Sequence, residues 1–384
     1  ARWAALELRK WDLGATVVFG NTALEPHLRD LIAQAWRATT ADAHGEPPWE
    51  RVNLVHVGTL LQDLRVEAGL PPLDDPAARF DLERQAQDIV GCGLTARFDL
   101  LYIDEAQDLG HETLGLLLSL VKRVPVGAQS TGEHCPVRVF YDNAQNVYRR
   151  PTPRWSEYGL DMRGRATVLK ESFRATRPAM ELALNLLHRL RPIDRDPDMR
   201  ELIAPRLGAP LLRMGEDGGW HADFCVIPGQ APEVTIHDRL EDELEGLVRS
   251  VRSWLADGVQ PRDIRVLAPT KMLCDSAADA LVIGGIPAVH ARNRAFEPRA
   301  AQVVVTTPQS FKGYEAELVA VVALDRFCTR AGGGAVLVEV IYVALTRART
   351  WMSVSASRAR PGTVGAQVVD ALWHAHKLCR GGQD

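Results

Sequence analysis

The sequence lacks several features that define common protein classes. Its six cysteines include no C-x-x-C pair and no adjacent histidine run, which argues against a zinc site and predicts reduced thiols. No apolar run approaches the roughly 20 residues of a membrane-spanning helix, and the amphipathic N-terminus is unlike a signal peptide. The net charge of −4 requires any nucleic-acid surface to be a local groove. These absences predict a soluble, cytoplasmic protein.

The chain is rich in apolar runs that are short enough to be strands. With 384 residues and 46% hydrophobic content, it can form two globular domains with sizeable cores. Strands that are apolar throughout and separated by helices indicate parallel sheets covered on both faces, so the pattern predicts a doubly wound α/β fold. The runs lie at 15–19, 52–57, 98–103, 137–141, 166–169, 264–268, 302–307, 318–324 and 352–356.

The strand runs form two blocks, which predicts two domains. The first block ends near Leu169 and the second begins near Ile264, with a helical stretch, PAMELALNLLHRL, between them. We place the domain boundary near 165–175. Segments 37–51 and 66–80 are polar and read as exposed loops or a small inserted subdomain. No internal repeat is visible in the sequence.

The most informative segment is FDLLYIDEAQDL, in which an apolar strand run ends at Asp104 and Glu105. In open parallel sheets, ligands bind at the carboxyl ends of the strands. An acidic pair there suits nucleotide hydrolysis, because Asp104 can hold Mg²⁺ through water and Glu105 can orient and polarise the attacking water. The alternative is an exposed acidic turn with no chemical role.

The string D-E-A-Q-D resembles motif II of the UvrD/Rep-like superfamily 1 DNA helicases, in which Gln107 and Asp108 would couple the site to neighbouring motifs. The next strand run, VRVFYDNAQNVYRR, resembles motif III of the same family, with Tyr141 in place of the usual glycine. The resemblance implies that Gln145 senses the γ-phosphate and that Tyr148 faces the nucleic-acid strand.

Two arginines belong to further segments that resemble this family. LKESFRATRPAM resembles motif IV, which implies that Arg174 stabilises the charge that grows on the γ-phosphate during transfer. EVIYVALTRARTWMSVSA is nearly an intact motif VI, which implies that Arg347 is an arginine finger that reaches the nucleotide from the second domain. The alternatives are a surface cation at Arg174 and a helix with Arg347 and Arg349 on its exposed face.

VVVTTPQSFKGYEAELVAVVAL resembles motif V, although Gln309 and Phe311 stand where histidine and alanine are common. The resemblance implies that Gly313 lets the backbone approach a ligand and that Glu315 accepts hydrogen bonds from a ribose. It also implies that Thr307 donates to a phosphate of the strand.

Weaker resemblances precede motif II. Asn21 and Thr22 follow the run 15–19 as in motif Ia, and Thr59 follows the run 52–57 as in motif Ib, so Asn21 and Thr59 would touch the nucleic-acid backbone. A polar residue after a strand is also commonly a helix cap. For base stacking, the aromatic candidates are Tyr148, Trp155 and Phe311.

The ordered motifs imply two RecA-like P-loop NTPase domains, 1–170 and 171–384, with parallel sheets and small helical insertions, the first of them near 37–95. The implied function is an ATP-dependent helicase or translocase that uses ATP and Mg²⁺ and moves on single-stranded DNA, with RNA a weaker expectation. The short spacing between motifs IV and V indicates a compact motor, which would accompany a nuclease or accessory domain outside this chain.

No G-x-x-x-x-G-K-[ST] phosphate-binding loop occurs in the sequence. In the family this loop precedes motif Ia by about one helix, so we expect the chain to start shortly after it and to hydrolyse little ATP as it stands. The alternative function is a catalytically inactive helicase-like module that binds nucleic acid or protein. A P-loop ATPase unrelated to helicases fits motifs V and VI poorly.

Overall fold

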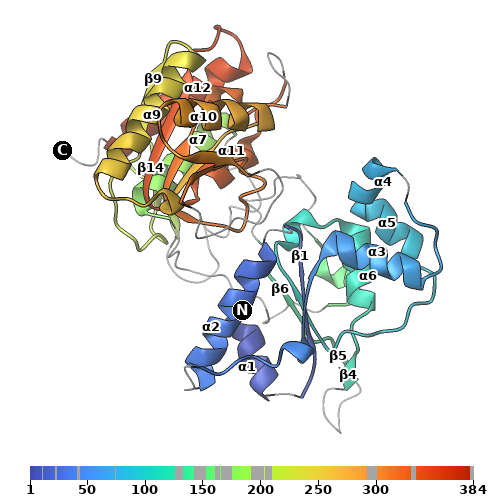
Figure 1. Cartoon of the computed structure of the whole chain (residues 1–384). Helices are drawn as coiled ribbons and strands as arrows, with labels where there is room; N and C mark the ends of the chain where they lie inside the picture. Colours follow the sequence, from blue (N-terminus) through green and yellow to red (C-terminus); the bar gives the residue numbers. More distant parts are fainter. Residues whose placement is uncertain are drawn as a thin grey trace. The chain divides into compact units, whose positions relative to one another are not determined.

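The computed structural model divides the chain into two compact units, Ala1–Thr167 and Val168–Asp384, and each is described by itself (Figure 1). The assignment of each unit as a RecA-like domain stays a prediction. The structure describes residues 1–10, 12–21, 24–40, 44–73, 75–125, 133–141, 153–160, 165, 175–191, 203, 210–291, 301–329 and 334–380.

The first unit is built on a sheet of four parallel strands in the order β2-β1-β3-β6. The strands are β1 (Ala15–Phe19), β2 (Val52–His56), β3 (Leu100–Ile103) and β6 (Val137–Val139). Both β1 and β3 are buried along their whole length, as their unbroken apolar runs predict.

Helices cover both faces of this sheet. One face packs against α1 (Arg2–Lys10) and α2 (Leu24–Thr40), with Leu8 and Ile32 in the core. The other packs against α3 (Val57–Glu67), α5 (Leu82–Ile89) and α6 (His111–Ser119). A short helix, α4 (Pro76–Phe80), and an antiparallel pair, β4 (Val124–Pro125) with β5 (Glu133–His134), complete the described part of the unit.

The second unit contains six parallel strands in the order β11-β12-β10-β13-β14-β9. They are β9 (Glu233–His237), β10 (Ile264–Leu267), β11 (Ala288–His290), β12 (Val303–Thr306), β13 (Ala316–Val321) and β14 (Ala348–Ser357). The helices are α7 (Arg177–Leu190), α9 (Leu240–Ala256), α10 (Lys271–Ile283), α11 (Val338–Leu345) and α12 (Val364–Arg380), and a hairpin joins β7 (Leu212–Met214) to β8 (Trp220–Ala222).

Local sequence explains where several of these helices begin. The Thr270 hydroxyl accepts the Leu273 N–H at 3.3 Å and caps α10, and the Asp81 carboxylate accepts the Arg84 N–H at 3.1 Å and caps α5. The apolar sides of α9 and α10 pack on one face of the second sheet. The first sheet, covered on both faces, is the middle layer of its unit.

The first sheet recurs inside the second. The first sheet has the spatial order β2-β1-β3-β6, so the first two strands of the chain exchange places and the next two follow in sequence. The central four strands of the second sheet, β12-β10-β13-β14, show the same order. The strands β11 and β9 extend the second sheet at its two edges. This repeat is one of topology, since no repeat is visible in the sequence.

The prediction of parallel, helix-covered α/β sheets is confirmed. Segments 37–51 and 66–80, expected to be exposed loops or a small inserted subdomain, are not loops throughout, because α2 continues to Thr40 and α4 covers Pro76–Phe80. The inserted subdomain stays a prediction. The strand β9 was missed because its exposed polar residues interrupt the apolar pattern. The predicted strand 166–169 lies outside the described residues. Within the described ranges, every helix is too short or too polar to cross a bilayer.

Candidate functional site

The turn after β3 places Asp104 and Glu105 at the carboxyl edge of the first sheet. The Asp104 N–H donates to the Val18 carbonyl of β1 at 2.9 Å, and the Ala106 N–H donates to the Phe140 carbonyl at 2.9 Å. Neighbouring segments on both sides of β3 therefore fix the turn. A short 3-10 helix, Ala106–Asp108, follows at once and directs the chain away from the sheet.

Glu105 adopts the left-handed backbone conformation, with φ 52° and ψ 45°. This conformation costs a residue with a side chain about 1–2 kcal/mol, and such strain is concentrated at functional sites. The side chain of Gln107, which is only 2% exposed, donates a hydrogen bond to the Glu105 carboxylate. Glu105 is itself partly exposed, as is Asp104. The backbone of both residues is thus fixed at the sheet edge, and Gln107 orients the Glu105 carboxylate.

These carboxylates lie where the strand order reverses. The chain passes from β1 to β2 on one side and then crosses to β3 on the other, which makes the β1/β3 edge the expected ligand site of the sheet.

Asn21 and Thr59 occupy different positions relative to this edge. Asn21 follows β1 directly, and its carbonyl accepts the Leu24 N–H at the beginning of α2. Thr59 lies within the first turn of α3 with its side chain exposed, and it is not the cap of that helix. The contacts of both residues with nucleic acid stay predictions.

Sequence reasoning missed His56, which is the cap of α3. Its Nδ1 accepts the Gly58 N–H at 3.1 Å, so the proton of the neutral ring is on Nε2, which donates to the Gly20 carbonyl at 3.1 Å. Burial lowers the pKa of His56, and the bond to Gly20 partly opposes this. A histidine that ends a strand and begins a helix was the available signal. His56 ties the end of β2 to the turn that carries Asn21.

Three predicted site residues cannot be placed. Gln145, Tyr148 and Arg174 lie outside the described residues, and so do Thr22 and Asp142.

In the second unit, Thr307 and Gly313 begin and end the turn after β12. The Thr307 hydroxyl lies 3.1 Å from Ser310 Oγ and also accepts the Ser310 N–H at 3.4 Å, so it stabilises the start of the turn. Gly313 has φ 87°, which favours glycine there. Phe311 is 1% exposed and stacks on Tyr314, with ring centroids 5.8 Å apart. The expectation that Phe311 stacks on bases is therefore wrong, because the ring belongs to the core.

Glu315 and Arg349 lie together beyond this turn. The Glu315 carboxylate is partly exposed and lies 3.7 Å from the Arg349 guanidinium, which also lies 3.2 Å from Glu317. Burial raises the pKa of the neighbouring Tyr314 phenol to about 12, so this ring stays neutral near physiological pH. The ribose-binding role of Glu315 stays a prediction.

Arg347 is fully buried, with 0% of its surface exposed. The helix α11 ends at Leu345, and the Arg347 guanidinium donates to the Val343 carbonyl at 2.9 Å and to Thr346 Oγ1 at 3.2 Å. Arg349 lies on β14. The alternative of an exposed helix face carrying both arginines is therefore wrong. A role for Arg347 as an arginine finger stays a prediction, and it requires the guanidinium to exchange these contacts for a phosphate.

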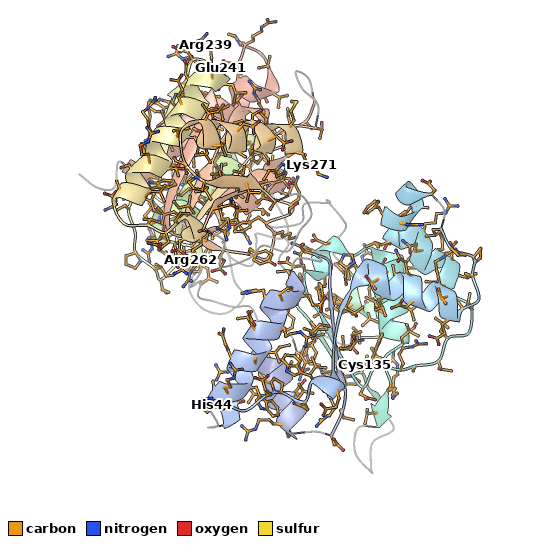
Figure 2. All side chains as sticks on the ribbon, viewed as in Figure 1. His44, Cys135, Arg239, Glu241, Arg262 and Lys271 are labelled. Atoms are coloured by element: carbon orange, nitrogen blue, oxygen red, sulfur yellow. The ribbon has the colours of Figure 1, made fainter. Side chains whose placement is uncertain are left out.

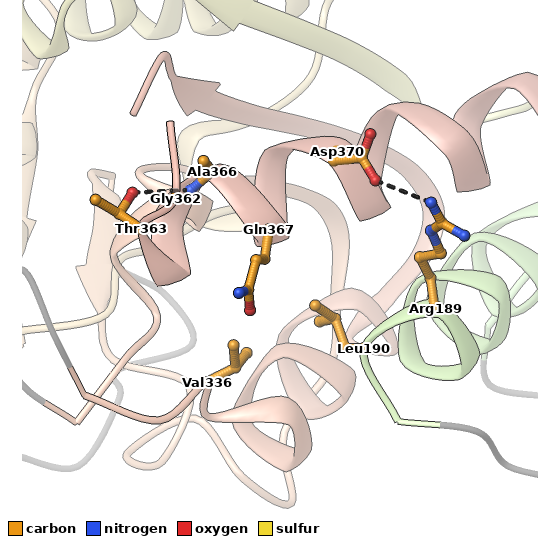
Figure 3. Close-up of a pocket in the computed structure, with 8 residues that line it drawn as sticks. All are labelled: Arg189, Leu190, Val336, Gly362, Thr363, Ala366, Gln367 and Asp370. Atoms are coloured by element: carbon orange, nitrogen blue, oxygen red, sulfur yellow. Dashed lines mark hydrogen bonds and ion pairs between the residues drawn. The ribbon is translucent and has the colours of Figure 1, made fainter. Parts of the chain in front are cut away.

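Two hollows of the described surface contain none of the predicted site residues. One of about 440 Å³ lies between α12 and the end of α7, where Arg189 and Asp370 are 3.3 Å apart (Figure 3). Thr363, which accepts the Ala366 N–H at 3.3 Å, lines its other side. None of the residues named in the motifs contributes to it. Its polar groups are largely paired with one another.

The two carboxylates at the β1/β3 edge, Asp104 and Glu105, suit a magnesium ion. No three His, Cys, Asp or Glu side chains gather as a metal site anywhere in the described part of the chain. Mg²⁺ is commonly held by one or two carboxylates together with waters and substrate phosphates. Asp104 and Glu105 fit that requirement and would not form an all-protein cage.

Comparison with known proteins adds little to this geometry. No protein-family model matches the chain, and no curated protein matches it. Among solved structures, the chain is similar to the C-terminal domain of a possible DNA helicase from Lactobacillus plantarum WCFS1, with a TM-score of 0.34 and 17% sequence identity. The likeness covers 52% of this chain and 96% of that domain. At this level it carries no argument about function.

Proposed function

We propose that the chain is the motor part of a UvrD/Rep-like superfamily 1 helicase, which couples ATP hydrolysis to movement on single-stranded DNA. The observation that carries the proposal is the strained Glu105 beside Asp104 at the carboxyl end of a buried parallel strand. Glu105 is a charged residue in a conformation that costs free energy, and it lies at the edge of the sheet where ligands bind. A chemical role at that edge explains this strain best.

Each predicted residue has a separable part in this reaction. Asp104 would hold Mg²⁺ through water, and Glu105 would orient and polarise the water that attacks the γ-phosphate. Gln107 supports the orientation of Glu105 through the hydrogen bond described above. Gln145, Arg174 and Arg347 would respond to the γ-phosphate and stabilise its developing charge. Mg²⁺, when bound, supplies neutralisation of phosphate charge.

Strand binding is proposed for the polar residues after the other strands. Asn21, Thr59 and Thr307 would contact phosphates without reading sequence, and Tyr148 and Trp155 would stack on bases. Trp155 packs partly on the core of the first unit, with its ring 5.8 Å from that of the exposed Tyr141. The repeated strand order of the two sheets supports two RecA-like domains. In the proposed function, Glu315 and Gly313 would lie beside the nucleotide.

The direct test measures binding of a fluorescently labelled single strand by anisotropy, without nucleotide, with ADP, and with a non-hydrolysable ATP analogue. It uses the chain itself and a form that carries a phosphate-binding loop ahead of Ala1. A motor changes its strand affinity with the nucleotide, because the two binding events are coupled reciprocally. Binding that is equal in all three conditions, in both forms, would favour the inactive binding module.

A further inference from the structure

The edge strand β9 has an outer side that no described strand covers. It is the last strand of the second sheet and pairs with β14 on its inner side (Figure 1). The carbonyl of His237 accepts the Arg358 N–H at 2.8 Å, so the backbone groups of His237 face inward. Because successive residues of a strand direct these groups to opposite edges, those of Val234 and Ile236 face outward.

A groove lies beside this edge. It has a volume of about 650 Å³ and runs between β9 and α12. Trp373 of α12, with 45% of its surface exposed, is its largest apolar side chain. The lining residues are Val234, Thr235, Ile236, Arg358, Ala359, Ala366, Val369, Asp370 and Trp373. An exposed tryptophan beside an open strand edge marks an interaction surface.

This edge lacks the features that keep strands apart. The segment Glu233–His237, EVTIH, contains no proline and no lysine, and its pairing with β14 has no bulge. Natural proteins commonly use these three devices to prevent pairing between edges. The described strand therefore lacks these three obstacles to a seventh strand, and its acidic residue, Glu233, lies at its end.

The sequence of β9 is complementary to itself when it is read in the opposite direction. In an antiparallel pair of two β9 strands centred on Thr235, Glu233 lies opposite His237, Val234 lies opposite Ile236, and Thr235 lies opposite Thr235. A carboxylate beside an imidazole, two β-branched residues and two threonines are each favourable cross-strand pairs. The outward backbone groups of Val234 and Ile236 would then bond to each other across the pair.

We propose that β9 pairs with the β9 of a second copy of this chain, antiparallel and centred on Thr235. The resulting contact is the same patch on both copies, as two-fold symmetry requires. It joins two six-stranded sheets into one continuous sheet. The two-fold axis lies perpendicular to that sheet, so both copies of α12 lie on one face, where Trp373 and Val369 of each cover the groove of the other.

The test is the association state of the whole chain, measured by sedimentation over a wide range of protein concentrations. Thr235→Lys places two like charges opposite each other at the two-fold axis, and Thr235→Asp does the same with the other sign. Thr235 is exposed, so neither change disturbs the folded monomer. Thr235→Val keeps a β-branched residue at the position and is the matched control.

We expect a concentration-dependent dimer for the wild type and for Thr235→Val, with dimerisation at least about tenfold weaker in each charged variant. An equal mixture of the Thr235→Lys and Thr235→Asp chains should restore the dimer, because unlike charges then meet. A wild type that is monomeric at every concentration overturns the proposal and leaves the edge to an extended peptide of another protein. Undiminished dimerisation of Thr235→Lys overturns it too. Neither readout depends on ATP or DNA.

Discussion

Two turns of the molecule have the same backbone conformation and differ in their side chains. The chain leaves β3 through Asp104 and Glu105, and it leaves β13 through Val322 and Ala323. Glu105 and Ala323 have φ of 52° and 55°, and in the described part of the chain no other residue apart from glycine has positive φ. A 3-10 helix follows each of them.

The backbone contacts of the two turns are equivalent as well. The Asp104 N–H donates to Val18 of β1 at 2.9 Å, and the Val322 N–H donates to Leu267 of β10 at 3.0 Å. The strands β1 and β10 occupy the same place in their sheets. The difference lies in the charge, because Val322 and Ala323 are buried whereas both carboxylates of the first turn are partly exposed.

The carboxylate nearest the second turn is buried and bonds to the backbone of the turn. Glu243 of α9 is fully buried and accepts the Ala323 N–H, Ser355 Oγ and Ser357 Oγ, each at 2.6 Å. Burial, and then the negative charge of Glu243, raise the pKa of the neighbouring Asp325. The left-handed conformation therefore does not by itself indicate chemistry. A reactive turn also needs exposed carboxylates, and of these two turns only the first has them.

The largest expected effect concerns the first turn. In a form of the chain that hydrolyses ATP, Glu105→Gln should lower kcat about 10²- to 10⁴-fold, because the amide cannot polarise the attacking water. Binding of ATP should remain, as measured with a fluorescent nucleotide. Glu50→Gln, at an exposed position of the same unit, is the control and should leave kcat unchanged. Wild-type turnover in Glu105→Gln would remove Glu105 from the mechanism.

Substitution of Glu243, which bonds to the second turn, should change the free energy of unfolding. Glu243→Ala leaves two buried donors and one partly buried donor without their acceptor and should lower the free energy of unfolding by about 3–5 kcal/mol, measured by urea denaturation. Glu241→Ala, two residues earlier on the exposed side of α9 (Figure 2), should change it by less than about 0.5 kcal/mol. Equal losses in the two variants would show that the Glu243 contacts contribute nothing specific.

Glycine should reveal the strain that the two turns share. Ala323→Gly and Glu105→Gly each remove a side chain from the left-handed region and should raise the free energy of unfolding by about 1 kcal/mol. Only Glu105→Gly should also lose ATP hydrolysis. Destabilisation by Ala323→Gly would mean that the packing of the buried Ala323 methyl group outweighs the strain and that the comparison between the turns fails.

The smallest expected effect is a pH dependence at His56. Its folded pKa lies below the ordinary value of 6.5, so the unfolded chain takes up the proton first as the pH falls. The stability that neutral His56 contributes is complete above that ordinary value and is lost as the pH falls towards the folded pKa.

Urea unfolding at about pH 7.5 and about pH 5.5 measures this contribution. His56→Asn keeps a side chain that can cap α3 but does not titrate, so its stability should fall less between the two conditions. An identical fall in the wild type and in His56→Asn would assign the pH dependence to other groups.

The sequence was sufficient to predict the parallel sheets, because β1, β3, β10 and β12 are buried on both faces and consist mostly of apolar residues. It was insufficient for β9, an edge strand with exposed polar residues, and for β11, which has three residues. Edge strands bury less surface, so their sequence carries a weaker pattern.

The same limit applies to the site. The acidic pair after β3 could be predicted because a strand and a motif coincide there, and the structure adds the backbone strain of Glu105. The burial of Phe311 could not be predicted, because the turn after β12 folds this ring inward against Tyr314. The role of His56 depends on a hydrogen bond to Gly20, which lies 36 positions away in the chain.

The most direct test of the account is ATP hydrolysis by the chain and by the form with a phosphate-binding loop ahead of Ala1, each with and without single-stranded DNA. The chain itself should show little turnover, and the extended form should show turnover that rises with added strand. Absence of ATP hydrolysis by the extended form, both with and without single-stranded DNA, would contradict the assignment of the β3 turn as a site of ATP hydrolysis.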